Sequence, residues 1–260
     1  MSRNLTKCIF CEQPVELDSV EHIVPESLGN LNYILQSGSI CRDCNNSFSE
    51  FEDKALSKTM LGFERSRLGI ATKKGKAAQA QSHNIKFVGD KKFRKNIVTV
   101  YGLEEKDIEE VMPDGSFKVK IMDFDKSDMA TVKLLLKIGL ESLYQSQRAI
   151  FKANDFTDLK QYLTKVNNKD WPILTVSNNS SALNGFFSIV RFLNKKRLKN
   201  IKCEILYKQI DNNVLLFNFR YSVLSYVVNL RSRSIDWVKP FMDVDKMALL
   251  YPEYLMKKLK

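Results

Sequence analysis

The sequence carries Cys8-Ile-Phe-Cys11 and, after 29 intervening residues, Cys41-Arg-Asp-Cys44. Each Cys-x-x-Cys pair turns tightly enough for two thiolates to face one ion, and two pairs complete a tetrahedral shell of four sulfurs that suits zinc. A closed shell leaves no position for water, so the zinc would be structural. The alternatives are two unrelated pairs or a redox pair, but a redox site needs one pair near a βαβ unit. We therefore expect this segment, which has little core of its own, to fold around zinc.

Between the two pairs lies a run that combines an acid, a histidine and a proline: Val20-Glu21-His22-Ile23-Val24-Pro25-Glu26-Ser27-Leu28-Gly29-Asn30. Directly after the second pair comes Asn45-Asn46-Ser47-Phe48. His22 is one of two histidines in the chain, the other being His83. A histidine that packs structurally or joins the zinc shell is the alternative to a functional His22, but four cysteines already fill that shell.

Together these features resemble the HNH endonucleases of the ββα-metal fold, in particular the subgroup with two zinc knuckles. The resemblance covers about residues 8–56. It includes, in order, the four cysteines, the acid-histidine-hydrophobic-hydrophobic-proline run and the Cys-x-x-Cys-Asn ending. It implies a module that holds a structural zinc and, separately, a catalytic Mg²⁺ or Mn²⁺.

The resemblance also implies roles for individual residues. Glu21 would bind the catalytic divalent ion, and His22 would be the general base that activates the attacking water. Asn45 would be the second ligand of that ion, although asparagine at this place is also common as a helix N-cap. The family's middle asparagine, which orients the histidine, has two candidates here, Asn30 and Asn32.

The chemistry of phosphodiester hydrolysis agrees with these residue types. The reaction needs a base, a cation on the phosphate and a held substrate. Carboxylate and amide oxygens are hard ligands that suit Mg²⁺ or Mn²⁺. Because adjacent residues of an extended strand point to opposite sides, Glu21 and His22 need a bulge or twist to serve one site, and we predict one there.

Charge is divided unevenly along the chain. Residues 1–53 hold three basic and nine acidic side chains, a net charge of −6, so the other 207 residues carry +17 of the total of +11. The acidic residues 1–53 could bind cations, and the basic remainder of the chain could bind a polyanion. The candidates for phosphate contacts follow the second cysteine pair: Lys54, Lys58, Arg65, Arg67, Lys73, Lys74 and Lys76. The alternative is a solvated basic surface, and a second cluster over 195–202 favours neither interpretation.

The chain as a whole is expected to be α+β, with a zinc-stabilised ββα-metal module followed by a mixed α+β domain. We predict the module over residues 1–62, a basic linker or arm over 63–84 and the second domain over 85–260, with an open role in DNA clamping, dimerisation or sensing. Periodicity and turn residues predict helices over 45–60, 127–148, 155–166 and 247–259, and strands over 85–88, 97–101, 117–121, 172–176, 186–192, 201–207, 214–220 and 221–230. Ser127 is the expected N-cap of the second helix, and residues 211–213 the expected hairpin turn between two strands.

These features favour a divalent-metal-dependent DNA endonuclease, with RNA as the alternative substrate. A homodimer would allow cleavage of both strands, and restriction or anti-phage defence would suit such an enzyme. A non-catalytic zinc-dependent nucleic-acid-binding protein on the same scaffold is the rival hypothesis, and a nuclease held inactive until its second unit binds a signal is a third. No apolar run of about 18 residues and no apolar N-terminal signal region are present, so we expect a cytoplasmic protein without a membrane span.

Overall fold

The computed structural model describes residues 6–15, 20–119, 129–165, 170–177, 185–192, 203–246 and 248–259. Its fold is α+β, as the sequence predicts, with an N-terminal segment that holds the cysteines and a sheet-rich C-terminal region. The chain divides into two compact units. Residues 1–50 and 132–260 make up the first, and residues 51–131 the second. Within the described residues, no helix combines the length and the apolar character that spanning a bilayer requires.

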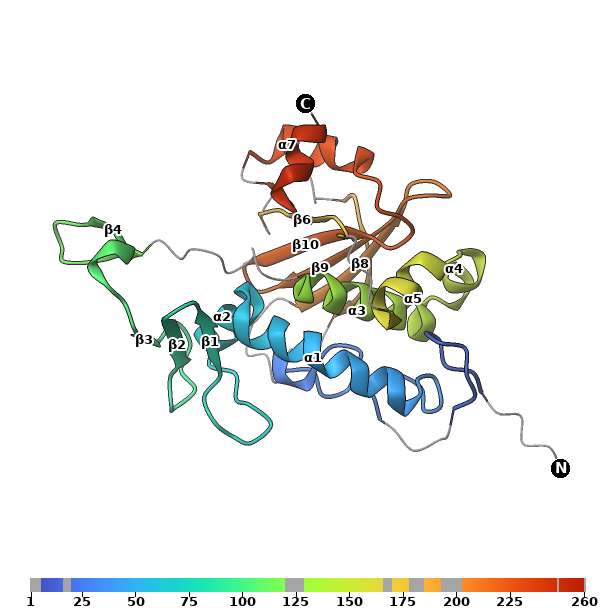
Figure 1. Ribbon diagram of the computed structural model, residues 1–260, viewed down its shortest axis with the longest axis horizontal. Helices are drawn as coiled ribbons and strands as arrows, with labels where there is room; N and C mark the ends of the chain where they lie inside the picture. Colours follow the sequence, from blue (N-terminus) through green and yellow to red (C-terminus); the bar gives the residue numbers. More distant parts are fainter. Residues whose placement is uncertain are drawn as a thin grey trace. The chain divides into compact units, whose positions relative to one another are not determined.

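A six-stranded antiparallel sheet forms the centre of the first unit (Figure 1). Its order is β11-β6-β10-β9-β8-β7. The strands are β6 (Ile173–Thr175), β7 (Ser188–Phe192), β8 (Cys203–Gln209), β9 (Leu215–Tyr221), β10 (Leu224–Asn229) and β11 (Leu249–Tyr251). The predicted turn at 211–213 joins β8 to β9, because the Asp211 carboxylate accepts the backbone N–H groups of Asn213 and Val214.

Every residue of β9 is buried, so both faces of the sheet are covered. One face packs on α3 (Ala130–Ser146), where a Cβ on Gly139 would come within 2.8 Å of the Leu230 side chain. Only glycine allows this close approach of helix and sheet. The other face packs beneath the C-terminal helices, which Figure 1 shows on the side away from α3: η4 (Asp236–Val238), α7 (Lys239–Val244) and η5 (Glu253–Lys258).

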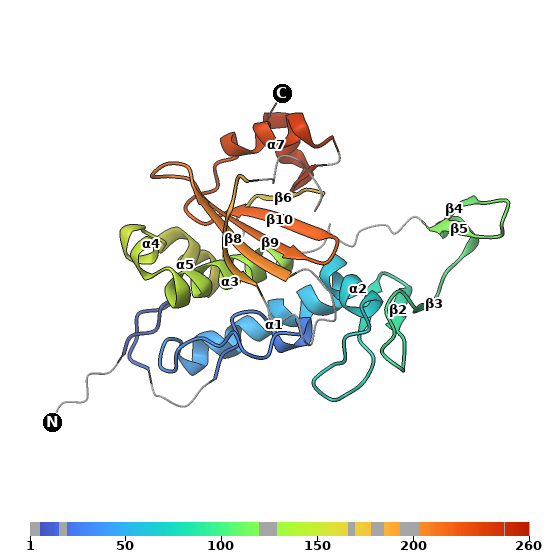
Figure 2. The same cartoon turned by 180° about the vertical axis from the view of Figure 1, so that it is seen from behind.

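Two short helices follow α3 on its side of the sheet, α4 (Arg148–Ala153) and α5 (Thr157–Thr164) (Figure 2). The helix predicted over 127–148 therefore ends and restarts near its C-terminus, and its proposed cap at Ser127 lies outside the described residues. The fifth cysteine, Cys203, is buried in β8, and burial raises the pKa of its thiol.

The N-terminal helix α1 (Arg42–Lys58) begins three residues earlier than the sequence predicts. It begins at the second cysteine pair because the Cys41 sulfur accepts the backbone N–H of Cys44 at 3.4 Å, in the manner of a helix cap. One face of α1 is buried and carries Phe48, Phe51, Ala55 and Leu56.

The second unit contains α2 (Met60–Arg67) and a three-stranded sheet of β1 (Gln79–Ser82), β2 (Ile85–Gly89) and β3 (Val98–Tyr101). Further along are η2 (Glu105–Asp107) and the hairpin of β4 (Ile108–Val111) and β5 (Phe117–Val119). The stretch 63–84, expected as a linker, thus holds most of α2 and all of β1. Ala78 and Ala80 are buried there, and such small side chains give little signal in a polar sequence.

Candidate active site

The four cysteines of the two pairs converge in the structure. Cys8 and Cys11 lie in a turn closed by the backbone bridge between Lys7 and Pro14, and the other two lie at the start of α1. All four sulfur atoms are within 4.8 Å of one another, and the Cys11 and Cys41 sulfurs are 3.5 Å apart. A tetrahedral zinc with bonds of ~2.3 Å places its sulfurs ~3.8 Å apart, so the cluster fits zinc.

The electrostatics of the cluster favour a thiolate. A hydrogen bond from the Cys44 thiol lowers the pKa of Cys8 to about 4, and the same contact raises the pKa of Cys44. A thiol must lose its proton to bind zinc, and the lowered pKa of Cys8 favours that loss. Near the cluster, Phe10 and Phe48 pack edge to face with ring centres 4.8 Å apart and help hold the first turn against α1.

Glu21 and His22 lie on a short antiparallel hairpin arm. His22 pairs with Ile34, and two backbone hydrogen bonds flank the pair, from Ile23 to Tyr33 and from Leu35 to Glu21. This is the hydrogen-bond pattern of one isolated antiparallel bridge, so the bulge or twist predicted at Glu21 and His22 stays a prediction. The side chains of Glu21 and His22 are both half-buried.

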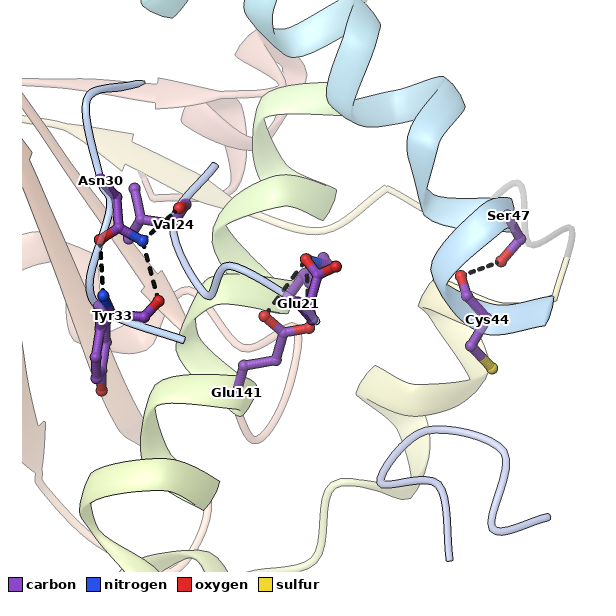
Figure 3. A network of polar contacts seen from close by, with 8 residues as sticks. Glu21, Val24, Asn30, Tyr33, Cys44, Ser47 and Glu141 are labelled. Atoms are coloured by element: carbon purple, nitrogen blue, oxygen red, sulfur yellow. Dashed lines mark hydrogen bonds and ion pairs between the residues drawn. The ribbon is translucent and has the colours of Figure 1, made fainter. Parts of the chain in front are cut away.

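The carboxylate of Glu21 contacts a lysine from the C-terminal region. Its Oε1 atom lies 2.5 Å from the Nζ of Lys137, which is completely buried in α3. Lys137 also pairs with Glu141, one turn further along α3, at 3.3 Å. Figure 3 shows the Glu21 and Glu141 carboxylates facing each other beside α3. The predicted metal ligand is thus already in contact with a positive charge.

Asn30 closes the loop between the two arms of the hairpin (Figure 3). Its Nδ2 donates to the carbonyl oxygens of Val24 and Tyr33 at 2.7 and 3.0 Å. Its Oδ1 accepts the backbone N–H groups of Tyr33 and Asn32 at 2.9 and 3.2 Å. The Asn30 side chain is buried, whereas Asn32 is exposed and takes part only through its backbone. Of the two predicted asparagines, Asn30 thus fixes the backbone that carries His22.

We expect Asn30→Ala to lower the free energy of unfolding by about 2–4 kcal/mol, because it leaves buried backbone groups without partners. Urea unfolding followed by fluorescence measures the change. The matched control is Asn32→Ala, which should change the free energy of unfolding by less than about 0.5 kcal/mol. Equal effects of the two substitutions would contradict a special role for the Asn30 side chain.

The hairpin is attached to α3 by further polar contacts. The Tyr33 hydroxyl lies 2.7 Å from the Ser146 hydroxyl and donates to the Ser142 carbonyl at 3.4 Å. Ser142 in turn contacts the Tyr207 hydroxyl, which donates to the Gly139 carbonyl at 2.6 Å. The side of the hairpin that carries Glu21 is therefore tied through α3 to the central sheet.

Sequence reasoning did not identify Lys137 and Glu141 as part of this site. The available signal was the presence of Lys137 and Glu141, four positions apart, in a largely apolar helix whose other charged residue is Lys133. Such a pair must be exposed or paired internally, and here both side chains are fully buried. Their partner, Glu21, lies 116 residues earlier in the chain, which the sequence alone does not reveal.

Asn45 lies within α1 and not at its cap. Its backbone N–H donates to the Cys41 carbonyl at 3.0 Å, as expected for a residue inside the first turns. N-capping, the alternative role for this asparagine, is therefore excluded. The side chain is half-buried and remains a candidate ligand. Among the described residues, clusters of three or more His, Cys, Asp or Glu ligand atoms are found at the four cysteines alone.

The predicted phosphate-binding residues belong to the second unit and differ in their surroundings. Arg65 is buried and donates to the Leu56 carbonyl at 3.2 Å. Arg67 forms two contacts with Glu64, at 2.6 and 2.7 Å, and this partner raises the pKa of Arg67. The lysines of the predicted set are all exposed: Lys54, Lys58, Lys73, Lys74 and Lys76. The second basic cluster, over 195–202, lies outside the described residues.

Comparison with known proteins agrees with this geometry. Residues 8–61 match the family model of the HNH endonucleases. No curated protein and no solved structure gives a significant match to the chain. The matched segment contains the cysteine cluster, the Glu21-His22 hairpin and α1. Residues 8–61 are therefore similar to the HNH endonucleases.

Proposed function

We propose that the protein is a divalent-metal-dependent endonuclease that hydrolyses phosphodiester bonds in DNA. The observation that carries this proposal is the Glu21-His22 pair, held on a hairpin that Asn30 closes, inside a segment similar to the HNH endonucleases. The similarity of residues 8–61 to the HNH endonucleases supports nuclease activity on a nucleic acid. The choice of DNA over RNA follows the family resemblance seen in the sequence.

Each candidate residue of the site has a proposed task. His22 accepts the proton of the attacking water, and its half-buried position leaves the imidazole accessible. Glu21 and Asn45 supply the oxygen ligands that would hold Mg²⁺ or Mn²⁺. When bound, such an ion neutralises charge on the phosphate and the leaving oxygen. Asn30 positions His22 by fixing the two backbone segments on either side of the loop.

The cysteine cluster is proposed to hold the structural zinc. The close approach of the four sulfurs supports this assignment, since a four-sulfur shell is complete and offers no place for substrate or water. The ion would connect the first turn to α1 and so hold the segment that carries Glu21 and His22. The protein would thus use two metals, one for folding and one for hydrolysis.

We propose that lysines of the second unit bind the nucleic acid. Lys73, Lys74 and Lys76 lie on a tight loop closed by the bridge between Ala71 and Ala77, where Gly75 adopts a positive φ of 69°. With Arg65, they line an open pocket of about 420 Å³. Exposed lysines on a loop suit the phosphate backbone, which is recognised by charge and not by base sequence.

Replacing Lys73, Lys74 and Lys76 together with glutamine is expected to weaken DNA binding about 10- to 100-fold at moderate salt. The slope of log affinity against log salt should fall by about 2–3, because up to three phosphate contacts are lost. Fluorescence anisotropy with labelled duplex at several salt concentrations measures both quantities. The control is glutamine at Lys239, Lys257 and Lys258, exposed lysines that carry the same charge. Equal losses of DNA affinity in both triple variants would mean that net charge, and not this loop, accounts for the effect.

Cleavage of supercoiled plasmid by the full chain tests the proposed function. We expect nicked or linear product with Mg²⁺ or Mn²⁺ and none with EDTA, and product ends that carry 5′-phosphate and 3′-hydroxyl. A single active site per chain gives nicking, whereas paired chains give linear product. DNA binding without cleavage under all metal conditions would support the non-catalytic rival instead. A role in restriction or anti-phage defence stays a prediction from the sequence.

A further inference from the structure

We propose that Lys137 is a positioning residue of the nuclease site, which holds the Glu21 carboxylate in the orientation that binds the divalent ion. This inference rests on the proposed function and adds a residue from the C-terminal region to the site. Its starting observation is the 2.5 Å contact between Nζ of Lys137 and Oε1 of Glu21.

The burial of the Lys137 ammonium is expected to lower the stability of the fold. Its side chain is 0% exposed, and α3 on either side of it is apolar and fully buried at Leu134, Leu136, Ile138 and Leu140. Burying an ammonium costs several kcal/mol unless it is well paired, and a hydrophobic residue of similar volume is often more stable. A lysine here is therefore poorly explained by stability, which points to a task at the group it contacts.

The geometry limits Lys137 to orienting the Glu21 carboxylate. Lys137 is completely buried, so it cannot touch a nucleic acid, whereas the Glu21 side chain is 13% exposed. The lysine therefore lies on the protein side of the carboxylate. It engages Oε1 and fixes the plane of the group, while the second oxygen is available to an ion that arrives from solvent.

Glu141 is the second carboxylate that Lys137 contacts. It lies four residues after Lys137 on the same helix, so the helix itself holds the two side chains side by side. The charges of Glu21, Lys137 and Glu141 themselves add up to −1, which favours a cation. Without Lys137, two carboxylates would share the site and would bind a divalent ion more tightly, but in a different place.

Three variants separate positioning from simple stabilisation: Lys137→Met, Glu141→Gln and the double variant Lys137→Met/Glu141→Gln. The double variant avoids an unpaired buried carboxylate at 141, and its Glu21 alone restores the wild-type net charge of −1. Zinc content and circular dichroism report whether each protein is folded. Mn²⁺ binding is measured by electron paramagnetic resonance on zinc-loaded protein, and plasmid cleavage is measured at saturating Mn²⁺.

For Lys137→Met we expect the Mn²⁺ dissociation constant to fall about fivefold and the cleavage rate to fall about tenfold or more. Partial unfolding would weaken both properties, so this opposite movement identifies positioning. The double variant should bind Mn²⁺ with nearly the wild-type dissociation constant and still cleave about tenfold more slowly. Glu141→Gln keeps Lys137 on Glu21 but removes one negative charge, so it should weaken Mn²⁺ binding about fivefold, the opposite of Lys137→Met.

The positioning role is overturned if the double variant cleaves within about threefold of a cleaving wild type. It is also overturned if folded Lys137→Met binds Mn²⁺ with an unchanged dissociation constant. Failure of the proposed function gives a different result, because wild type would then neither cleave plasmid nor bind Mn²⁺ apart from the cysteine site.

Discussion

His22→Ala is expected to lower the rate of plasmid cleavage about 10²- to 10⁴-fold, the usual contribution of a general base. The zinc content should stay at wild-type level, since the four-cysteine cluster does not include His22. The free energy of unfolding should change by less than about 1 kcal/mol, because the side chain is only half-buried. Gel analysis of plasmid nicking at saturating Mg²⁺, with protein checked for zinc and thermal stability, measures the effect.

The chain offers a matched control for this substitution. His83 is the second of its two histidines and lies in the turn between β1 and β2, in the second unit. His83→Ala removes the same imidazole and should leave the cleavage rate within about threefold of wild type. If His22→Ala cleaves as fast as wild type, or if both variants lose activity alike, His22 is not the base.

The second large effect is expected from the cysteine cluster. Cys44→Ser should abolish stoichiometric zinc binding and unfold the segment around the hairpin, because the cluster joins the first turn to α1. A structural zinc contributes about 10–16 kcal/mol of apparent binding free energy in small domains, as much as or more than a typical domain's whole stability of about 5–15 kcal/mol. Atomic absorption for zinc and thermal unfolding by circular dichroism measure the two consequences.

Cys203→Ser is the control for that experiment, since Cys203 is buried in β8 away from the cluster. It should keep one zinc per chain and lose only about 1–3 kcal/mol of stability, the cost of burying a hydroxyl. Retention of zinc by Cys44→Ser would contradict the four-sulfur site. Acid should release zinc from wild type, because protons compete with the metal for thiolates.

Local features of the fold could be predicted from the sequence. The spacing of the four cysteines, the helix after Cys44 and the turn at 211–213 each depend on residues close together in the chain, and the structure contains all three. Strand periodicity likewise anticipates the strands of the central sheet over 172–230, but the helix predicted over 247–259 is wrong at its start, where β11 forms the edge of that sheet. Such features follow from capping, turn chemistry and alternation, which act over a few residues.

The surroundings of Glu21 could not be predicted. The sequence places an acid before the histidine, but the contact with Lys137 forms only when α3 packs against the hairpin. The grouping of residues 1–50 with 132–260 in one compact unit has the same cause, since contacts such as Tyr33 with Ser146 span 113 residues. The hairpin also depends on Asn30, whose four hydrogen bonds fix the backbone on either side of its loop.

The central claim is a second metal site at Glu21, separate from the zinc of the cysteine cluster. Crystals of the full chain soaked in Mn²⁺, with diffraction recorded on both sides of the manganese and zinc absorption edges, test it most directly. We expect a zinc peak among the four sulfurs and a manganese peak within about 2.3 Å of oxygen atoms of Glu21 and Asn45. A zinc peak alone, with Glu21 bound only to Lys137 at saturating Mn²⁺, would contradict the proposed site.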